Sequence, residues 1–230
     1  MQADSIQVQR PWGTPQYLIL LYHGFGSTPS AMVPVGNRLS LAYPQSLVVS
    51  IVAPYPSDIG AGRQWFSLLG ITDENRMQRV AASMDSFLDT VLEWQARAGL
   101  GSDRTVLAGF SQGATMLLEG LKARPDLAAR AISFGGRFAA LPTRPFRNTY
   151  VHLLHGQADP VVHCRHSIVA AERLLSMGSP VTLDIKPRVG YAIDEGMLSA
   201  ALHHLLATTV RTAAFPRASA RVPPWHPGPH

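Results

Sequence analysis

The sequence predicts an α/β fold, with a mostly parallel central sheet of about six to seven strands and helices on both faces. Short apolar runs without polar alternation, typical of strands buried on both faces, recur along the chain. Stretches with helical periodicity fill the gaps, and this alternation favours parallel strands. The predicted strands cover residues 17–22, 47–53, 104–108, 131–134, 150–154 and 181–185.

Most of these strands end at a residue that breaks extended structure. The first (YLILLY) is followed by an HGFG segment, and the second (LVVSIVA) by a proline. A glycine lies at or near the end of the third, fourth and fifth strands: Gly109, Gly135 and Gly156. The loops after the strands are therefore sharply defined, and they all belong to the carboxyl edge of the sheet.

Four helices are predicted from apolar residues that recur at three- and four-residue steps. They cover residues 75–98, 111–123, 163–177 and 193–208. The clearest is the first, in which Val80, Met84, Phe87 and Val91 fall on one face. We predict a single domain over residues 1–211 and a disordered, Pro- and Arg-rich tail over residues 212–230.

Composition excludes several classes of protein. The chain has 230 residues, of which 46% are hydrophobic, as expected for one large core. No apolar run approaches the roughly 18 residues of a membrane span, and the N-terminus lacks a signal-peptide pattern, so we expect a cytoplasmic protein. Cys164 is the single cysteine, which excludes an intrachain disulfide and a cysteine zinc site. The net charge is +5, but the basic residues are scattered, so we expect no nucleic-acid partner.

A GxSxG motif lies between a predicted strand and a predicted helix. It reads Gly109-Phe110-Ser111-Gln112-Gly113, and this strand–turn–helix setting is that of a nucleophile elbow. The turn strains the backbone of the serine and leaves no room for side chains beside it, which accounts for the glycines. We therefore predict Ser111 as the nucleophile rather than a serine that only caps a helix.

An oxyanion hole is predicted from two backbone N–H groups. His23-Gly24-Phe25-Gly26 follows the first predicted strand, where hydrolases with this elbow supply one donor. The residue after the nucleophile supplies the other, so Phe25 and Gln112 are assigned to this role. Because the loop works through its main chain, we expect His23 to be a packed histidine.

The acid and the base of a catalytic triad should follow later in the chain, in the order Ser, Asp, His. Asp159 lies in the loop after the fifth predicted strand and suits the role of the triad acid. The alternative is that it only stabilises a turn before Pro160. The loop after the sixth strand contains no histidine. Tyr191 stands where the base is expected.

These motifs resemble the phospholipase/carboxylesterase branch of the α/β-hydrolases, and within it the small bacterial serine esterases. The matching stretches lie between about residues 6 and 210 and are LLYHGFG, GNRLS, LVVSI, AGRQWFSLLGITDENR, GFSQGA, LLHGQADPV and VTLDI. The resemblance implies a serine esterase with Ser111 as nucleophile, Asp159 as orienting acid and no metal or organic cofactor. It also implies that Trp65 and Phe66 line the acyl site, with core packing as the alternative.

Family members carry Gly-His where this chain has Gly190-Tyr191. Phenol has a pKa near 10 and imidazole near 6.5, so neutral Tyr191 is a poor base at pH 7. His163 is the nearest histidine that could replace it, although we expect it on the surface. His203 and His204 lie about 18–20 Å further along a helix. The His163/His166 and His203/His204 pairs lack a third metal ligand.

Three hypotheses follow for function. In the first, the chain is a serine carboxylesterase for short-to-medium acyl esters that works through a Ser111 acyl-enzyme on a small-molecule ester, and it is either weak or rescued by another base. Alternatively it is a non-catalytic protein that binds acyl ligands in the same pocket. In the third hypothesis, Tyr191 is an isolated substitution in an otherwise normal esterase.

Overall fold

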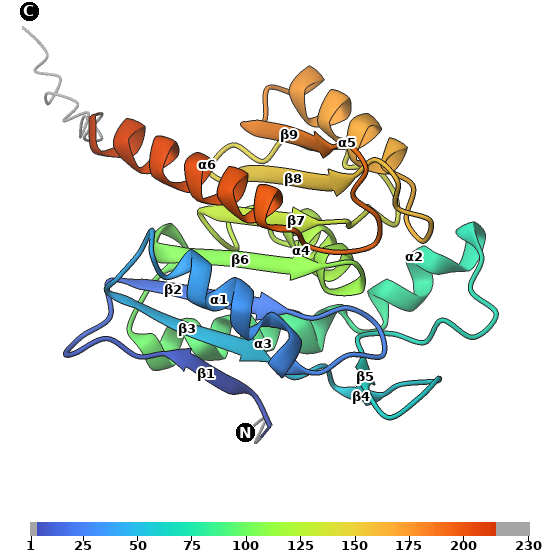
Figure 1. The fold of residues 1–230 in the computed structure, drawn as a ribbon, viewed down its shortest axis with the longest axis horizontal. Coiled ribbons are helices and arrows are strands. Elements are labelled where there is room, and N and C mark those ends of the chain that lie inside the picture. Colours follow the sequence, from blue (N-terminus) through green and yellow to red (C-terminus); the bar gives the residue numbers. More distant parts are fainter. Residues whose placement is uncertain (1–3, 215–230) are drawn as a thin grey trace, which may run out of the picture.

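A seven-stranded sheet runs through the protein in the computed structural model, which describes residues 4–214 (Figure 1). The strand order is β1-β3-β2-β6-β7-β8-β9, and every neighbouring pair is parallel except β1 and β3. The predicted mostly parallel sheet is therefore confirmed. The strands are β1 (Ile6–Gln9), β2 (Tyr17–Tyr22), β3 (Ser46–Ile51), β6 (Thr105–Phe110), β7 (Arg130–Phe134), β8 (Tyr150–Gly156) and β9 (Val181–Lys186).

Helices cover both faces of this sheet. Figure 1 shows α1 (Val33–Leu39) and α6 (Glu195–Ala214) in front of it, with α3 (Met84–Ala98) and α4 (Gln112–Ala123) behind. Side chains of α5 (Arg165–Ser176) belong to the same buried cluster as those of α3 and α4, whereas α1 and α6 share a second cluster. The sheet is thus buried on both sides, which explains why its central strands are mostly apolar and lack a regular alternation of apolar and polar residues.

The register of the parallel strands brings the site loops together. Tyr22 at the end of β2 pairs with Gly109 of β6, and Gly109 pairs with Ser133 of β7. The loops that start at His23, Ser111 and Gly135 therefore leave the sheet side by side at its carboxyl edge. In open α/β sheets this edge is where ligands bind.

The structure corrects the predicted helix over residues 75–98. It consists of two helices, α2 (Asp73–Ala81) and α3, separated by a turn at Ala82 and Ser83. The apolar periodicity does not reveal the break, because Val80 before it and Met84 after it are buried in the same cluster. Thr72 caps α2 through a reciprocal pair of hydrogen bonds with Asn75, which fixes its first turn.

Four smaller elements were not predicted: β1, β4 (Tyr55–Pro56), β5 (Arg63–Gln64) and α1. β1 is an antiparallel edge strand whose residues are half-buried or exposed, so its sequence lacks the apolar run used to find the others. β4 and β5 pair as a separate two-stranded sheet, and α1 is only seven residues long. Of the predicted tail, residues 212–214 belong to α6 and residues 215–230 lie outside the described part of the chain. None of the helices described is long and apolar enough to span a membrane.

Candidate active site

Ser111 lies in a tight turn between β6 and α4. Its backbone angles are φ 52° and ψ −111°, in a region that non-glycine residues rarely adopt. Its N–H donates a hydrogen bond to the carbonyl of Phe134, at 2.9 Å, so the neighbouring strand holds the strained turn in place. A non-glycine residue in such a conformation is typical of a functional site. The strand–turn–helix setting predicted for the motif is present.

The two glycines of the motif are required by close backbone contacts. A Cβ atom on Gly113 would lie 2.3 Å from the carbonyl oxygen of Tyr22 and 2.6 Å from that of His23. A Cβ on Gly109 would lie 2.7 Å from the backbone N of Ala114. Helix α4 can therefore start directly against the end of β2 only because these residues have no side chain.

Gly113→Ala is expected to lower the free energy of unfolding by about 3 kcal/mol, because rigid backbone atoms cannot yield to the added methyl group. Gly196→Ala is a matched control, since both glycines are the second residue of a helix. A Cβ on Gly196 would meet nothing closer than 3.5 Å, so this variant should be at least as stable as the parent. Urea denaturation measures both, and equal stability of the two variants would contradict the account.

Two segments of backbone, the turn after β2 and the start of α4, lie beside Ser111. Gln112 is the first residue of α4, so its N–H has no acceptor within the helix. Phe25 follows Gly24 in the turn after β2, and both residues line the cavity beside the nucleophile. A Cβ on Gly24 would lie 3.5 Å from the Cβ of Ser111, which shows how closely this loop approaches the serine. The arrangement suits two donors directed at one oxygen.

His23 packs in the core below this loop. Its Nδ1 lies 2.8 Å from the carbonyl of Gly24, so Nδ1 carries the proton, and Nε2 accepts from the N–H of Ala53 at 3.2 Å. The side chain is fully buried, and burial lowers the pKa of this imidazole. His23 is therefore a neutral, packed histidine that fixes the loop, as predicted.

Tyr191 lies beside Ser111. Its O–H donates a hydrogen bond to Ser111 Oγ at 2.6 Å, and its ring packs on Phe110 with centroids 4.8 Å apart. Burial raises the pKa of this phenol above its usual 10.0, the hydrogen bond with Ser111 opposes the rise, and the charge of Asp159 adds to it. The phenol therefore stays neutral at physiological pH and donates a hydrogen bond to the serine oxygen, whereas a base would accept one from the serine hydroxyl.

Asp159 lies next to these groups. Its Oδ1 accepts hydrogen bonds from the N–H groups of Val161 and Val162 at 2.8 and 2.9 Å. This is the geometry of an aspartate that stabilises a turn, the alternative role considered above. Its Oδ2 lies beside Gly135, where a Cβ would be 3.5 Å away. Asp159 thus closes its own turn with one oxygen, and its other oxygen lies 3.5 Å from Nε2 of the buried His155. Tyr191 has a single polar atom, already used on Ser111, so it cannot link acid and nucleophile as an imidazole does.

The two histidines nearest to Asp159 in the sequence, His155 and His163, form hydrogen bonds to groups other than Ser111. His155 is fully buried, with Nε2 2.7 Å from the carbonyl of Val162 and Nδ1 2.7 Å from the hydroxyl of Ser167, so both nitrogens are used. His163 is exposed, as expected, and its Nδ1 accepts from the N–H of Arg165. Within residues 4–214 no group of three or more His, Cys, Asp or Glu side chains is placed to hold a metal ion.

Trp65 and Phe66 are buried in the core, with 2% and 4% of their surface exposed. The side chain of Gln112 accepts from the N–H of Trp65 at 2.8 Å and donates to the carbonyl of Phe66 at 2.7 Å. The Trp65 indole N–H donates to the carbonyl of His23 at 2.8 Å. Both aromatic rings are packed in the core, which was the alternative role. That they also bind the acyl group stays a prediction. Their contacts tie the two oxyanion loops together.

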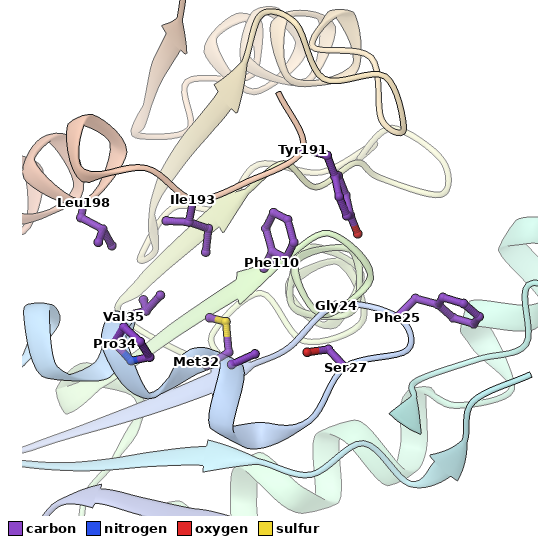
Figure 2. Close-up of a pocket in the computed structure, with 11 residues that line it drawn as sticks. Gly24, Phe25, Ser27, Met32, Pro34, Val35, Phe110, Tyr191, Ile193 and Leu198 are labelled. Carbon is purple, nitrogen blue, oxygen red and sulfur yellow. The ribbon is translucent and has the colours of Figure 1, made fainter. Parts of the chain in front are cut away.

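An apolar cavity of about 430 Å³ opens beside Tyr191. Figure 2 shows Met32, Pro34 and Val35 facing Ile193 and Leu198 across it. The volume falls within the range of small-molecule sites. These residues come from α1, the preceding turn and the start of α6, and the sequence did not indicate them. They are ordinary core-type residues, and only the packing of two distant helices leaves a space between them.

Known proteins share much of this sequence. The chain is 48% identical over 208 residues to the esterase YpfH of Escherichia coli, covering 90% of each protein. It is 26% identical over 194 residues to an acyl-protein thioesterase 1 of Neurospora crassa, covering 76% of this chain and 79% of that one.

Solved structures share the fold. Esterase PE8 superposes with a TM-score of 0.78 at 26% identity, covering 87% of this chain and 95% of that one. A carboxylesterase of Bacillus cereus gives 0.74 at 18% identity, covering 87% and 92%. The α/β-hydrolase fold is thereby confirmed. The family model described as phospholipase/carboxylesterase matches residues 3–209. The chain belongs to the phospholipase/carboxylesterase family of hydrolases.

Proposed function

We propose that the protein is a serine carboxylesterase that cleaves short-to-medium acyl esters through a Ser111 acyl-enzyme, and that Tyr191 in place of histidine makes its turnover slow. The observation that carries this proposal is the 2.6 Å hydrogen bond from the Tyr191 hydroxyl to Ser111 Oγ. It places residue 191 in contact with the nucleophile, where a base would act. The group at this position is a hydroxyl that donates a hydrogen bond to the serine, whereas a base would accept the serine proton.

The reaction has two acyl transfers. Ser111 Oγ attacks the ester carbonyl carbon, and the backbone N–H groups of Phe25 and Gln112 stabilise the oxyanion that forms. The serine proton must then reach the leaving alkoxide, after which water attacks the acyl-serine and its proton returns to Ser111. The strained elbow positions Ser111 for the attack, and the two loops supply the N–H groups that stabilise the oxyanion. The proton transfers lack an imidazole.

The magnitude of this defect follows from general acid–base catalysis. A positioned base typically contributes 10² to 10⁴ in rate, about 3–5 kcal/mol of barrier. The oxyanion hole and substrate binding do not depend on the base, and together they leave about 10³–10⁴ over the uncatalysed reaction. We therefore expect measurable but slow turnover that depends on Ser111.

The apolar cavity is the proposed acyl site. It lies beside Tyr191 and Phe110, is lined by apolar side chains, and has a volume that suits a short or medium chain. The two relatives compared above are named as an esterase and an acyl-protein thioesterase, and cleavage of either bond passes through the same acyl-serine.

Val35→Phe is expected to fill this cavity from α1 and to lower kcat/KM for p-nitrophenyl octanoate about tenfold relative to p-nitrophenyl acetate. Excluding two methylene groups forfeits about 1.6 kcal/mol of burial, which is close to a tenfold change. Initial rates on both esters give the ratio, and the acetate rate controls for damage to the catalytic groups. An unchanged ratio would place the acyl chain elsewhere.

The alternative function is that of a non-catalytic protein that binds acyl ligands. It is favoured by the neutral phenol on Ser111 and by the absence of a group that connects Asp159 to the serine. Ser111→Ala separates the two functions. If the protein is an esterase, this variant falls to the uncatalysed rate and the parent stays above it. If it is a binding protein, parent and variant hydrolyse p-nitrophenyl acetate equally slowly and both retain acyl ligands.

A further inference from the structure

A second cavity, of about 320 Å³, lies away from the acyl site and has a different chemical character. It is formed by the loop after β7, residues 137–141, and by the first turns of α5. Three basic side chains line it, Arg137, Arg165 and His166, together with apolar groups that include Phe138 and Val169. The cavity thus combines cationic groups with an apolar wall.

The positive charge of this region exceeds its negative charge. Arg137 Nη2 lies 3.1 Å from Asp73 Oδ1, and Arg76 Nε lies 3.6 Å from the same oxygen. Asp73 is 73% exposed, whereas each arginine side chain is only 19% exposed. One solvated carboxylate therefore faces two guanidinium groups that have lost much of their water. Among the described residues, no carboxylate lies within 4 Å of the Arg165 guanidinium.

Burial and the excess of positive charge both lower the pKa values of Arg76 and His166. Burial lowers the pKa of Arg76, and repulsion from Arg137 lowers it further. Burial also lowers the pKa of His166, and Arg137 again adds to the effect. The buried Nε–H of Arg76 has no hydrogen-bond acceptor among residues 4–214. Guanidinium groups stay charged at any physiological pH, so the region holds a stable cationic field.

The cavity is connected to the catalytic loops by a short piece of chain. Gly135, which starts the loop after β7, lies beside Asp159 Oδ2, and Arg137 follows two residues later. A group bound in the cavity would therefore lie on the α5 side of the site, whereas the acyl cavity is on the α1 and α6 side.

We propose that this cationic cavity, defined by Arg137, Arg165 and His166, binds an anionic group, a carboxylate or phosphate, carried on a short apolar stem. The planar guanidinium forks suit the oxygen geometry of either anion, and the apolar wall suits the stem. The anion belongs either to the alcohol part of an ester substrate or to a separate phosphorylated molecule. This site is additional to the proposed esterase function.

The test is isothermal titration calorimetry of the parent chain with hexyl phosphate, hexanol and inorganic phosphate at low ionic strength. Hexyl phosphate should bind more tightly than the other two. Arg165→Gln and Arg137→Gln should each weaken it about tenfold, the loss expected for one charged hydrogen-bonding group. Arg165 is exposed and in no ion pair described, so its variant tests the site even if Arg137→Gln destabilises the fold.

Arg147→Gln is the matched control, because it removes one exposed positive charge near the start of β8, at the opposite edge of the sheet. It should leave the affinity unchanged. The proposal is overturned if Arg165→Gln has no effect, if Arg147→Gln weakens binding as much as Arg165→Gln, or if hexanol binds as well as hexyl phosphate. None of these results depends on ester hydrolysis, so failure of the esterase proposal would be seen separately.

A kinetic comparison identifies the source of the anion. Arg165→Gln is introduced into Tyr191→His and tested on an acetate ester of 4-hydroxybenzoate and on the neutral p-nitrophenyl acetate. A loss of kcat/KM confined to the acidic ester shows that the cavity receives the substrate's own anion. Equal kinetics on both esters, combined with weakened hexyl phosphate binding, show that it receives a separate molecule.

Discussion

Tyr191→His is expected to raise kcat/KM for p-nitrophenyl acetate by about three decades, the middle of the range for a positioned general base. The Tyr191 hydroxyl contacts Ser111 Oγ, so residue 191 faces the serine, and an imidazole, which is shorter than a phenol, reaches the serine proton when the loop moves toward Ser111. Its pKa near 6.5 allows it to accept that proton at pH 7, which the neutral phenol cannot do. Its second nitrogen can turn to Asp159, whose charge already acts on the side chain at position 191. Initial rates at pH 7.5 measure the gain.

Two further variants show whether the gain has this origin. Adding Ser111→Ala to Tyr191→His should remove it completely, since the imidazole acts through the serine. Tyr191→Phe has no polar group at this position and should stay at the low parental rate or below it. If the histidine variant gains less than about tenfold, then either the loop at residue 191 or Asp159 does not support a triad.

Activity of the parent chain is expected to rise about tenfold for each pH unit between about pH 6 and pH 9, a total of about three decades. The phenolate of Tyr191 can act as a base, but burial holds the pKa of the phenol above 10.0, so its fraction increases tenfold per pH unit throughout this interval. Tyr191→His should instead reach a plateau above about pH 7, because its imidazole is then fully deprotonated.

The measurement is the pH dependence of kcat/KM, with the rate of Ser111→Ala subtracted at each pH to remove attack by hydroxide. Tyr191→Phe is the matched control, since it keeps the ring on Phe110 and loses the titrating hydroxyl. It should show no such rise. A parental profile that levels off near neutral pH would show that a group with an ordinary histidine pKa is the base, and it would contradict the role assigned to Tyr191.

The sheet and the elbow were predictable because their physical requirements are local in sequence. A strand covered on both faces must be apolar at successive positions, as in β2 and β3, and a strained elbow requires glycines at Gly109 and Gly113. The alternation of strands with helices then fixes which loops share the carboxyl edge. Ser111, Asp159 and Tyr191 could be named for this reason before any distance was known.

Other features depend on contacts between distant residues and left no local pattern. The turn between α2 and α3 keeps both helices on one core, so the periodicity passes through it. The acyl cavity forms because Met32 and Val35 approach Ile193 and Leu198 from the other end of the chain. The resemblance to the family nominated Trp65 for the acyl site, whereas its indole binds the carbonyl of His23. The direction of the Tyr191 hydrogen bond also required the structure.

Locating the acyl group on the protein tests the central claim, that Ser111 is the nucleophile of an esterase, most directly. The parent chain is mixed with p-nitrophenyl acetate, quenched in acid, digested and analysed by mass spectrometry. We predict one acetyl group, on Ser111, which accumulates because deacylation lacks the same base as acylation. Acetylation of Tyr191 in place of Ser111, or no acetylation at all while Tyr191→His is equally unmodified and inactive, would contradict the claim.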